Sequence, residues 1–231
     1  MPFDIASPEH MAAVRTALSA PRLAPFEIHA GNDRLGGLRL YEWNLRAGSA
    51  CFLTLHAVEI VLRNTLFDQM TAWHTAQKLP GCWFDDPLRL LDQRCHLDIA
   101  HARRRLHLQG LPTLPERILT ELSFGFWRFL LAKRYERTLW EFSLRHGFPH
   151  LPRQRRRDVA EPVERLHKLR NRVAHHEPIY KRDLVRDMSD ARLVLGAISP
   201  SALAWAEENS TLPAVILQRP EQLTIPLPRC P

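Results

Sequence analysis

The sequence contains little lysine, glycine and cysteine. Lysine occurs 4 times in 231 residues, glycine 9 times and cysteine 4 times. The cysteines show no CxxC spacing, which argues against the common zinc sites and against a disulfide framework. Neither a GxGxxG nor a GxxxxGK[ST] pattern occurs, so the common phosphate-binding loops are absent.

Long apolar runs are also missing. The best candidate, residues 50–62, is interrupted by His56 and Glu59, whereas a membrane helix needs roughly 18 apolar residues. The first ten residues lack the basic start and the apolar stretch of a signal peptide. An apolar fraction of 45% is nevertheless enough to fill a core. We therefore expect a globular, cytoplasmic protein with no membrane partner.

Positive charge is plentiful and comes almost entirely from arginine. The 32 basic and 25 acidic residues give a net charge of +7, and 28 of the basic residues are arginine. The planar guanidinium matches phosphate, although a GC-rich genome also favours arginine codons. Residues 151–176 hold eight basic and three acidic residues, and residues 103–105 form a second cluster. The charge is thus compatible with a polyanion without identifying one.

The periodicity of apolar residues predicts an all-α fold. We expect a helix over residues 7–20, a loop over 21–32 and two helices over 33–77, because three glycines interrupt that stretch. Further helices are expected over 128–145 and from about 153 to before Pro178. Residues 1–210 are predicted to form one helical domain, with helix 7–20 as a possible appendage. The proline-rich residues 211–231 are predicted to form an extended tail.

One segment concentrates polar chemistry near the end of a predicted helix. Residues 170–177 read RNRVAHHE. A histidine can exchange a proton with a ribose 2′-hydroxyl or a leaving 5′-oxygen, and an arginine can hold phosphoryl oxygens as charge builds on them. On an ideal helix Arg170 and His175 are about 140° apart, so they share a face only if the helix ends or distorts near Ala174. Alternatively, these cations simply favour a helix C-terminus, with Glu177 as a partner.

Several motifs together resemble a known family. LRNRVAHHEPIY at residues 169–180 resembles the signature of the Abi-like abortive-infection proteins of the AbiD and AbiF type, and it fits the Arg-x4-His motif of the wider HEPN superfamily. The segments LYEWN (40–44), EIVLRN (59–64) and ELSFGFW (121–127) resemble further family elements in the right order, and Tyr135 and Trp140 follow as expected. The resemblance covers residues 18–198.

This resemblance implies a fold and an activity. HEPN proteins are helical bundles, often homodimers whose motifs meet in one composite site, and many are metal-independent endoribonucleases that leave 2′,3′-cyclic phosphate and 5′-hydroxyl ends. Abi-like proteins are linked to phage defence. The resemblance thus implies a HEPN-like bundle with additional helices that cuts RNA without a cofactor. The RNA could be tRNA or a cognate small RNA, and a protein or RNA antitoxin could hold the toxin silent.

The resemblance also assigns roles to individual residues. Arg170 and His175 match the two ends of the motif and are the predicted catalytic residues. The predicted supporting residues are Asn171, His176, Glu177, Glu59, Arg63 and Asn64. From charge and not from the resemblance, the basic side chains expected to contact RNA are Arg165, Lys168, Arg172, Arg103, Arg104 and Arg105. For residues 103–105 a plain exposed face is the alternative interpretation.

Other candidates have a structural and a functional interpretation. Glu59 and Arg63 are either a second wall of the RNA site, with Glu59 positioning an arginine, or an ion pair that fixes helix register. The aromatic block at residues 124–127 either stacks on bases or belongs to the core. Asp92 and His96 have helical spacing but lack further metal ligands, and we expect no metal site.

Two hypotheses follow from the sequence. The first is a metal-independent endoribonuclease acting in abortive infection. The second is a helical module that binds RNA or a protein without cutting. A DNA-binding module is a weaker third possibility, because no helix-turn-helix signature is apparent.

Overall fold

The computed structural model describes residues 4–220, and every regular element in them is helical. The all-α prediction is therefore confirmed. The main helices are α1 (Pro8–Leu18), α2 (Ala20–His29), α3 (Arg34–Ala76), α4 (Gln93–Leu108), α5 (Pro115–Glu121), α6 (Phe124–Leu130), α7 (Arg156–Ala174), α8 (Leu184–Ile198), α9 (Pro200–Glu208) and α10 (Leu212–Leu217). Short 3-10 or π turns lie at Trp83–Asp85, Lys133–Tyr135, Glu136–Trp140 and Leu144–Gly147.

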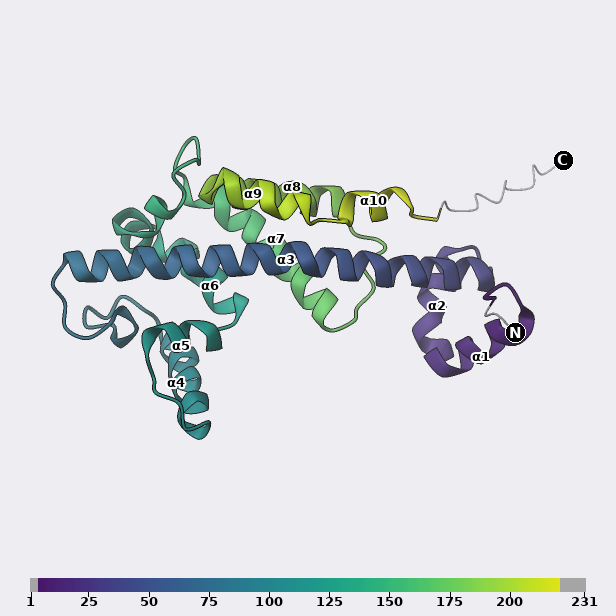
Figure 1. Cartoon of the computed structure of the whole chain (residues 1–231), viewed down its shortest axis with the longest axis horizontal. Coiled ribbons are helices and arrows are strands. Elements are labelled where there is room, and N and C mark those ends of the chain that lie inside the picture. Colours follow the sequence, from purple (N-terminus) through teal and green to yellow (C-terminus); the bar gives the residue numbers. More distant parts are fainter. Residues whose placement is uncertain (1–3, 221–231) are drawn as a thin grey trace.

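The helix α3 runs along the length of the molecule and most of the other helices pack against it, whereas α1 packs on α2 and α4 on α5 (Figure 1). The prediction of two helices over residues 33–77 was wrong, because α3 is continuous over 43 residues. Asp33 starts it by accepting hydrogen bonds from the N–H groups of Leu35 and Gly36 at 3.0 and 2.9 Å. At Gly37 a Cβ atom would lie 2.8 Å from the Cα atom of Glu27 in α2. The glycine thus serves close helix packing and does not break the helix.

By length and composition alone, α3 could also cross a membrane. It contains an 18-residue window with a mean hydropathy of 1.4, of which 39% is buried inside the protein. The sequence had suggested that no stretch was suitable, since His56 and Glu59 interrupt the apolar run. The core helix of a globular bundle has the same composition, and here α3 packs against α2, α7 and α8.

The helix α7 crosses α3, and α8 packs against both (Figure 1). Arg165 of α7 donates two hydrogen bonds to the buried carboxylate of Asp190 in α8, at 2.6 and 2.7 Å. This charged pair joins the two helices near the middle of α7. Pro162 lies inside α7, which continues through it.

Two further segments differ from the expectation. Residues 21–32, predicted as a loop, form most of α2 because Pro21 lies in its first turn, where a proline costs no hydrogen bond. Residues 128–145, predicted as one helix, are divided into the end of α6 and three short turns. The carbonyl of Leu131, freed where α6 ends, accepts a hydrogen bond of 2.6 Å from the buried Arg156 side chain. A tertiary contact therefore stabilises this break.

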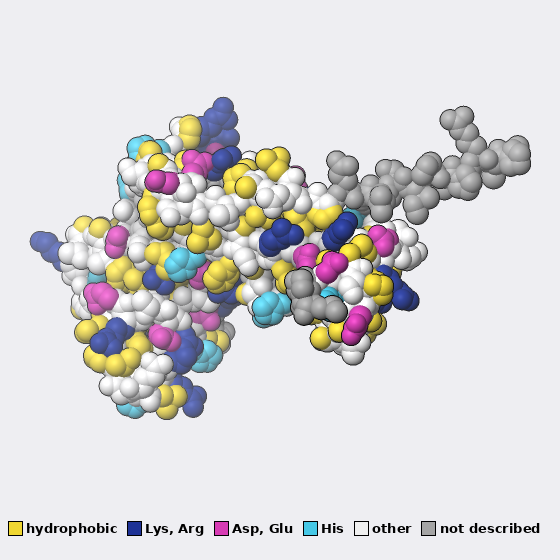
Figure 2. All heavy atoms as spheres, turned by 45° about the vertical axis from the view of Figure 1, so that its right-hand side comes forward, with side chains coloured by type: hydrophobic (Ala, Val, Ile, Leu, Met, Phe, Trp, Pro, Cys, Tyr) yellow, Lys and Arg dark blue, Asp and Glu magenta, His cyan; other side chains and the backbone are white. Residues whose placement is uncertain are grey.

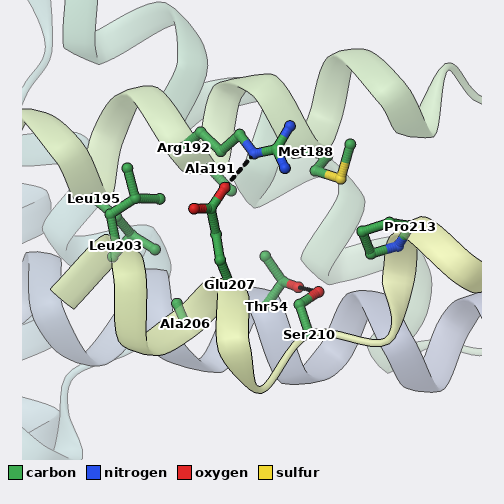
Figure 3. A pocket seen from close by; sticks show the side chains of 10 residues that line it. All are labelled: Thr54, Met188, Ala191, Arg192, Leu195, Leu203, Ala206, Glu207, Ser210 and Pro213. Carbon is green, nitrogen blue, oxygen red and sulfur yellow. Dashed lines mark hydrogen bonds and ion pairs between the residues drawn. The ribbon is translucent and has the colours of Figure 1, made fainter. Parts of the chain in front are cut away.

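The chain after Ser210 continues as α10 and is not an extended tail over its first part. Leu212 is buried, and the indole N–H of Trp43 donates to the carbonyl of Val215 at 2.7 Å. Just before α10, the hydroxyl groups of Ser210 and Thr54 lie 3.3 Å apart beside a small cavity between α3, α8 and α9 (Figure 3). Residues 211–220 thus belong to the helical bundle, and residues 221–231 of the predicted tail lie outside the described residues.

Candidate ribonuclease site

The helix α7 ends at Ala174, inside the sequence motif. His175 is the C-cap residue, and His176 takes a left-handed conformation with φ of 55°. The N–H of His176 donates to the carbonyl of Val173 at 3.1 Å, and the N–H of Glu177 donates to that of Arg172 at 2.7 Å. This pair of bonds is a Schellman motif, in which glycine is the usual left-handed residue. The helix end expected near Ala174 is therefore present, and a histidine holds the strained position.

The segment after the motif is fixed by buried contacts. The side-chain oxygen of Asn44, a buried residue of α3, accepts hydrogen bonds from the N–H groups of Ile179 and Tyr180 at 2.7 and 3.1 Å. Arg22 of α2 donates to the carbonyl of His176. The two histidines thus lie on a turn anchored at both ends, and their own side chains are exposed.

Arg170 faces α3 and pairs with Glu59. The Nε atom of Arg170 lies 3.5 Å from a carboxylate oxygen of Glu59, and both side chains are partly buried. Glu59 therefore positions an arginine, as one interpretation of the sequence suggested, but the arginine is Arg170 and not its helical neighbour. Arg63 instead donates to the side-chain oxygen of Asn64 at 3.3 Å. The segment EIVLRN (59–64) thus contacts the motif through Glu59.

The amide of Asn171 does not turn toward His175. It lies 3.4 Å from Nε2 of His167, one helical turn earlier. The ring of His167 packs edge-on against Phe124 of α6, and burial together with the nearby Arg128, Arg170 and Arg94 lowers its pKa. The sequence analysis missed His167, although its spacing of four residues from Asn171 was a usable signal.

An open groove borders the motif on its other side. Its volume is about 720 Å³. It is lined by Arg22, Asn44, Leu45, Gly48, Ser49, Phe52, Arg170, Val173, Ala174, His176, Glu177 and Ile179. Leu45 and Phe52 are 48% and 52% exposed, and they contribute apolar surface to the groove. Apolar surface and the motif are thus continuous.

Most of the other basic residues predicted to bind RNA have protein partners. Arg165 is held by Asp190, Arg103 by Asp85 and Arg105 by Glu121. Lys168 lies 3.0 Å from Glu164, and Arg172 lies 3.5 Å from Glu177 and also donates to the carbonyl of Pro178. Arg104 is exposed. These ion pairs lower the net charge that the sequence clusters offer to a polyanion.

Figure 2 shows Lys and Arg side chains scattered among acidic ones, with a denser group at the top of the view, over the loop that precedes α7. Arg153, Arg155 and Arg157 are exposed in this region. The basic surface is thus widest at the start of α7, whereas Arg170 and His175 lie near its end.

Two further sequence candidates have structural roles. The aromatic side chains of Phe124, Phe126 and Trp127 are buried in the core, so base stacking on them is not available in this structure. Asp92 caps α4 by accepting from the N–H of Cys95 at 3.0 Å, and it also pairs with Arg134. Among residues 4–220, no group of three or more potential ligand side chains is arranged to hold a metal ion.

No family model, curated protein or solved structure matches the chain. The resemblance to the Abi-like family therefore depends on the sequence motifs alone.

Proposed function

We propose that the protein is a metal-independent endoribonuclease of the HEPN type that acts in the cytoplasm in phage defence. The observation that carries the proposal is the arrangement of the Arg-x4-His motif, with Arg170 held by Glu59 and His175 exposed on an anchored turn. Arg170 would stabilise the charge on the phosphoryl oxygens, and His175 would transfer the proton. His176, Glu177 and Asn171 would shape the turn and the end of α7.

In this proposal the chain forms a HEPN-like helical bundle and works as a homodimer with a composite site. An exposed stripe of α3 that carries the apolar side chains of Leu45 and Phe52 supports a second copy as the partner. Leu45, Ser49, Phe52 and His56 recur at spacings of four, three and four residues, and all four are exposed. This spacing is that of a helix seam that packs against another helix. The stripe borders Arg170, so pairing along it would bring two motifs together.

RNA cleavage by the purified protein tests the proposal. We expect 5′-hydroxyl and 2′,3′-cyclic phosphate ends, unchanged cleavage in EDTA, and loss of cleavage in His175→Ala and Arg170→Ala. A matched control is His101→Ala, which removes an exposed histidine from α4 and should leave the rate unchanged.

Two outcomes would overturn the mechanism: cleavage that EDTA abolishes, or cleavage that survives in His175→Ala. Salt-dependent RNA binding without any cyclic-phosphate product would instead favour the second hypothesis, a binding module that does not cut RNA. Expressing wild type and His175→Ala in a bacterium and sequencing 5′-hydroxyl RNA ends would identify the RNA that is cut.

A further inference from the structure

His167 occupies a recess between α6 and α7, one turn before the motif. Its ring centre lies 5.6 Å from that of Phe124, in an edge-on arrangement. At Gly125 a Cβ atom would come within 3.3 Å of Nε2 of His167. The absence of a side chain at Gly125 thus leaves room for the imidazole, and α6 can approach α7 closely there.

Positive charge gathers around this imidazole. Arg128 of α6, Arg170 of α7 and Arg94 of α4 are its charged neighbours, together with one carboxylate, that of Glu164. Arg94 stacks over the ring of Phe129, with 4.8 Å from its guanidinium carbon to the ring centre. Arg128 lies 4.0 Å from Glu164 of α7, and Arg170 follows His167 by three residues on the same helix. Arg94 reaches this group through Phe129, the neighbour of Arg128 in α6.

The nearby carboxylates do not neutralise this group. Glu164 lies 3.0 Å from Lys168 and 4.0 Å from Arg128, so two cations share it. Glu59 pairs with Arg170. With Arg94 included, four cations lie beside two carboxylates, and a net positive charge remains for an anion to neutralise.

One buried donor in the group also lacks an acceptor within residues 4–220. Nε of Arg128 is buried and makes no hydrogen bond there, whereas the buried Nε of Arg170 has the Glu59 carboxylate 3.5 Å away. A buried N–H without an acceptor is costly, and an anion bound beside it removes that cost. The planar forks of arginine suit the oxygens of a phosphate in particular.

We infer that Arg94, Arg128 and Arg170 form, around His167, a subsite for a phosphodiester of the RNA strand next to the one that is cut. The inference rests on the proposed function, since it names where the same substrate continues. His167 and His175 are eight residues apart, about 12 Å along α7. One phosphate does not contact both histidines, but two phosphates of one strand can occupy the two places, with Arg170 between them.

The imidazole provides a readout that does not depend on activity. The pKa of His167 is lowered by burial and by Arg128, Arg170 and Arg94, against a weaker effect of Glu164 in the other direction. A phosphate anion bound among these arginines would offset their effect. Binding must therefore raise the pKa of His167 and shift its ring resonances in an NMR titration.

The first experiment titrates the full-length protein with inorganic phosphate and with a short RNA made uncleavable by a 2′-deoxy sugar at the cut position. We expect both to shift the His167 signals and raise its pKa, with Arg128→Gln weakening RNA binding about tenfold and lowering the salt dependence by about one phosphate contact. Arg128→Lys keeps the charge without the planar guanidinium. Its affinity for the RNA should therefore lie between those of wild type and Arg128→Gln. Arg186→Gln, an exposed position on α8, should bind as wild type does.

A second RNA, with an uncharged methylphosphonate beside the cut position, distinguishes RNA from a free anion. Wild type should bind this RNA about tenfold more weakly than it binds the unmodified RNA. Arg128→Gln should bind the two RNAs equally. Equal binding of both RNAs by wild type, His167 signals that do not respond, or wild-type affinity in Arg128→Gln would overturn the inference. Because this RNA cannot be cleaved, the binding results test the subsite alone. Cleavage of ordinary RNA tests the proposed function separately.

Discussion

At the scale of single residues, Glu59 connects the long helix to the motif. Its carboxylate lies 3.5 Å from Nε of Arg170, and the two side chains are 21% and 34% exposed. An ion pair with this exposure adds little to stability, about 1 kcal/mol or less. We therefore assign Glu59 a positioning role, in which it sets the direction of the arginine that contacts the phosphate.

The substitution Glu59→Gln tests this role. We expect kcat for RNA cleavage to fall about 10- to 100-fold, because Arg170 loses its fixed direction, while KM and the free energy of unfolding change little. Glu141→Gln, an exposed position, should leave kcat unchanged. An unchanged kcat in Glu59→Gln, or a fall explained entirely by unfolding, would remove the positioning role.

The motif was visible in the sequence, but its partners were not. Arg170 and His175 could be named from their spacing, and the helix end near Ala174 followed from Pro178. The pairing of Glu59 with Arg170 depends on how α3 and α7 cross, whereas His167 and Asn171 lie four residues apart on one helix. Spacing along one helix limits such pairs, whereas the partner from another helix is set by tertiary packing.

At the scale of helices, glycine has opposite consequences at two positions of α3. At Gly37 an added Cβ would lie 2.8 Å from the backbone of Glu27, whereas at Gly48 it would meet nothing within 4 Å. We expect Gly37→Ala to destabilise the protein by about 1–3 kcal/mol, because α2 must move away. Gly48→Ala should stabilise it by about 0.5–1 kcal/mol, since alanine favours the helix.

Urea unfolding of the two variants, followed by circular dichroism, measures the difference. Equal effects of both substitutions would mean that Gly37 is not a packing position. The close packing of α2 on Gly37 explains why residues 33–77 were wrongly predicted as two helices. Local preference alone treats a glycine inside a helix as a break, and the contact with α2 appears only in the folded structure.

Helix existence was predicted better than helix limits. The start of α1 at Pro8 agrees with the helix expected over residues 7–20. The error at α2 is local, because Pro21 lies in the first turn of that helix and does not interrupt it. The error at residues 128–145 arises because the deciding contact comes from a distant segment, Arg156 at the carbonyl of Leu131. The extended tail was wrong over α10 for the same reason, since Trp43 and Thr54 of α3 hold it.

At the scale of the whole molecule, the proposed activity depends on a second copy. A HEPN-type composite site needs two motifs, and one chain carries the longer family signature once, at residues 169–180. The exposed stripe on α3 lies beside Arg170, in the groove that also contains Val173 and Ala174. Packing of two such stripes would place apolar contacts at the centre and the basic motifs beside them.

Phe52 is the largest exposed apolar side chain of this groove, and its replacement by glutamate tests the dimer. An aromatic residue at the centre of an interface commonly contributes about 2 kcal/mol or more, so dimerisation should weaken about 30-fold or more. We expect light scattering to show a dimer for wild type and a monomer for Phe52→Glu at the same concentration. Trp205→Glu, at an aromatic residue on α9 with similar exposure, should remain dimeric.

Cleavage measured on the same samples decides whether the two copies share one site. If they do, Phe52→Glu loses RNA cleavage while keeping its helical content, and raising the protein concentration restores the rate in proportion to the dimer formed. Wild type that is monomeric yet active would contradict the composite site, and so would a Phe52→Glu monomer that cleaves at the wild-type rate. Since Phe52 itself is not assigned to the chemistry, lost activity that returns with concentration can arise only from lost pairing.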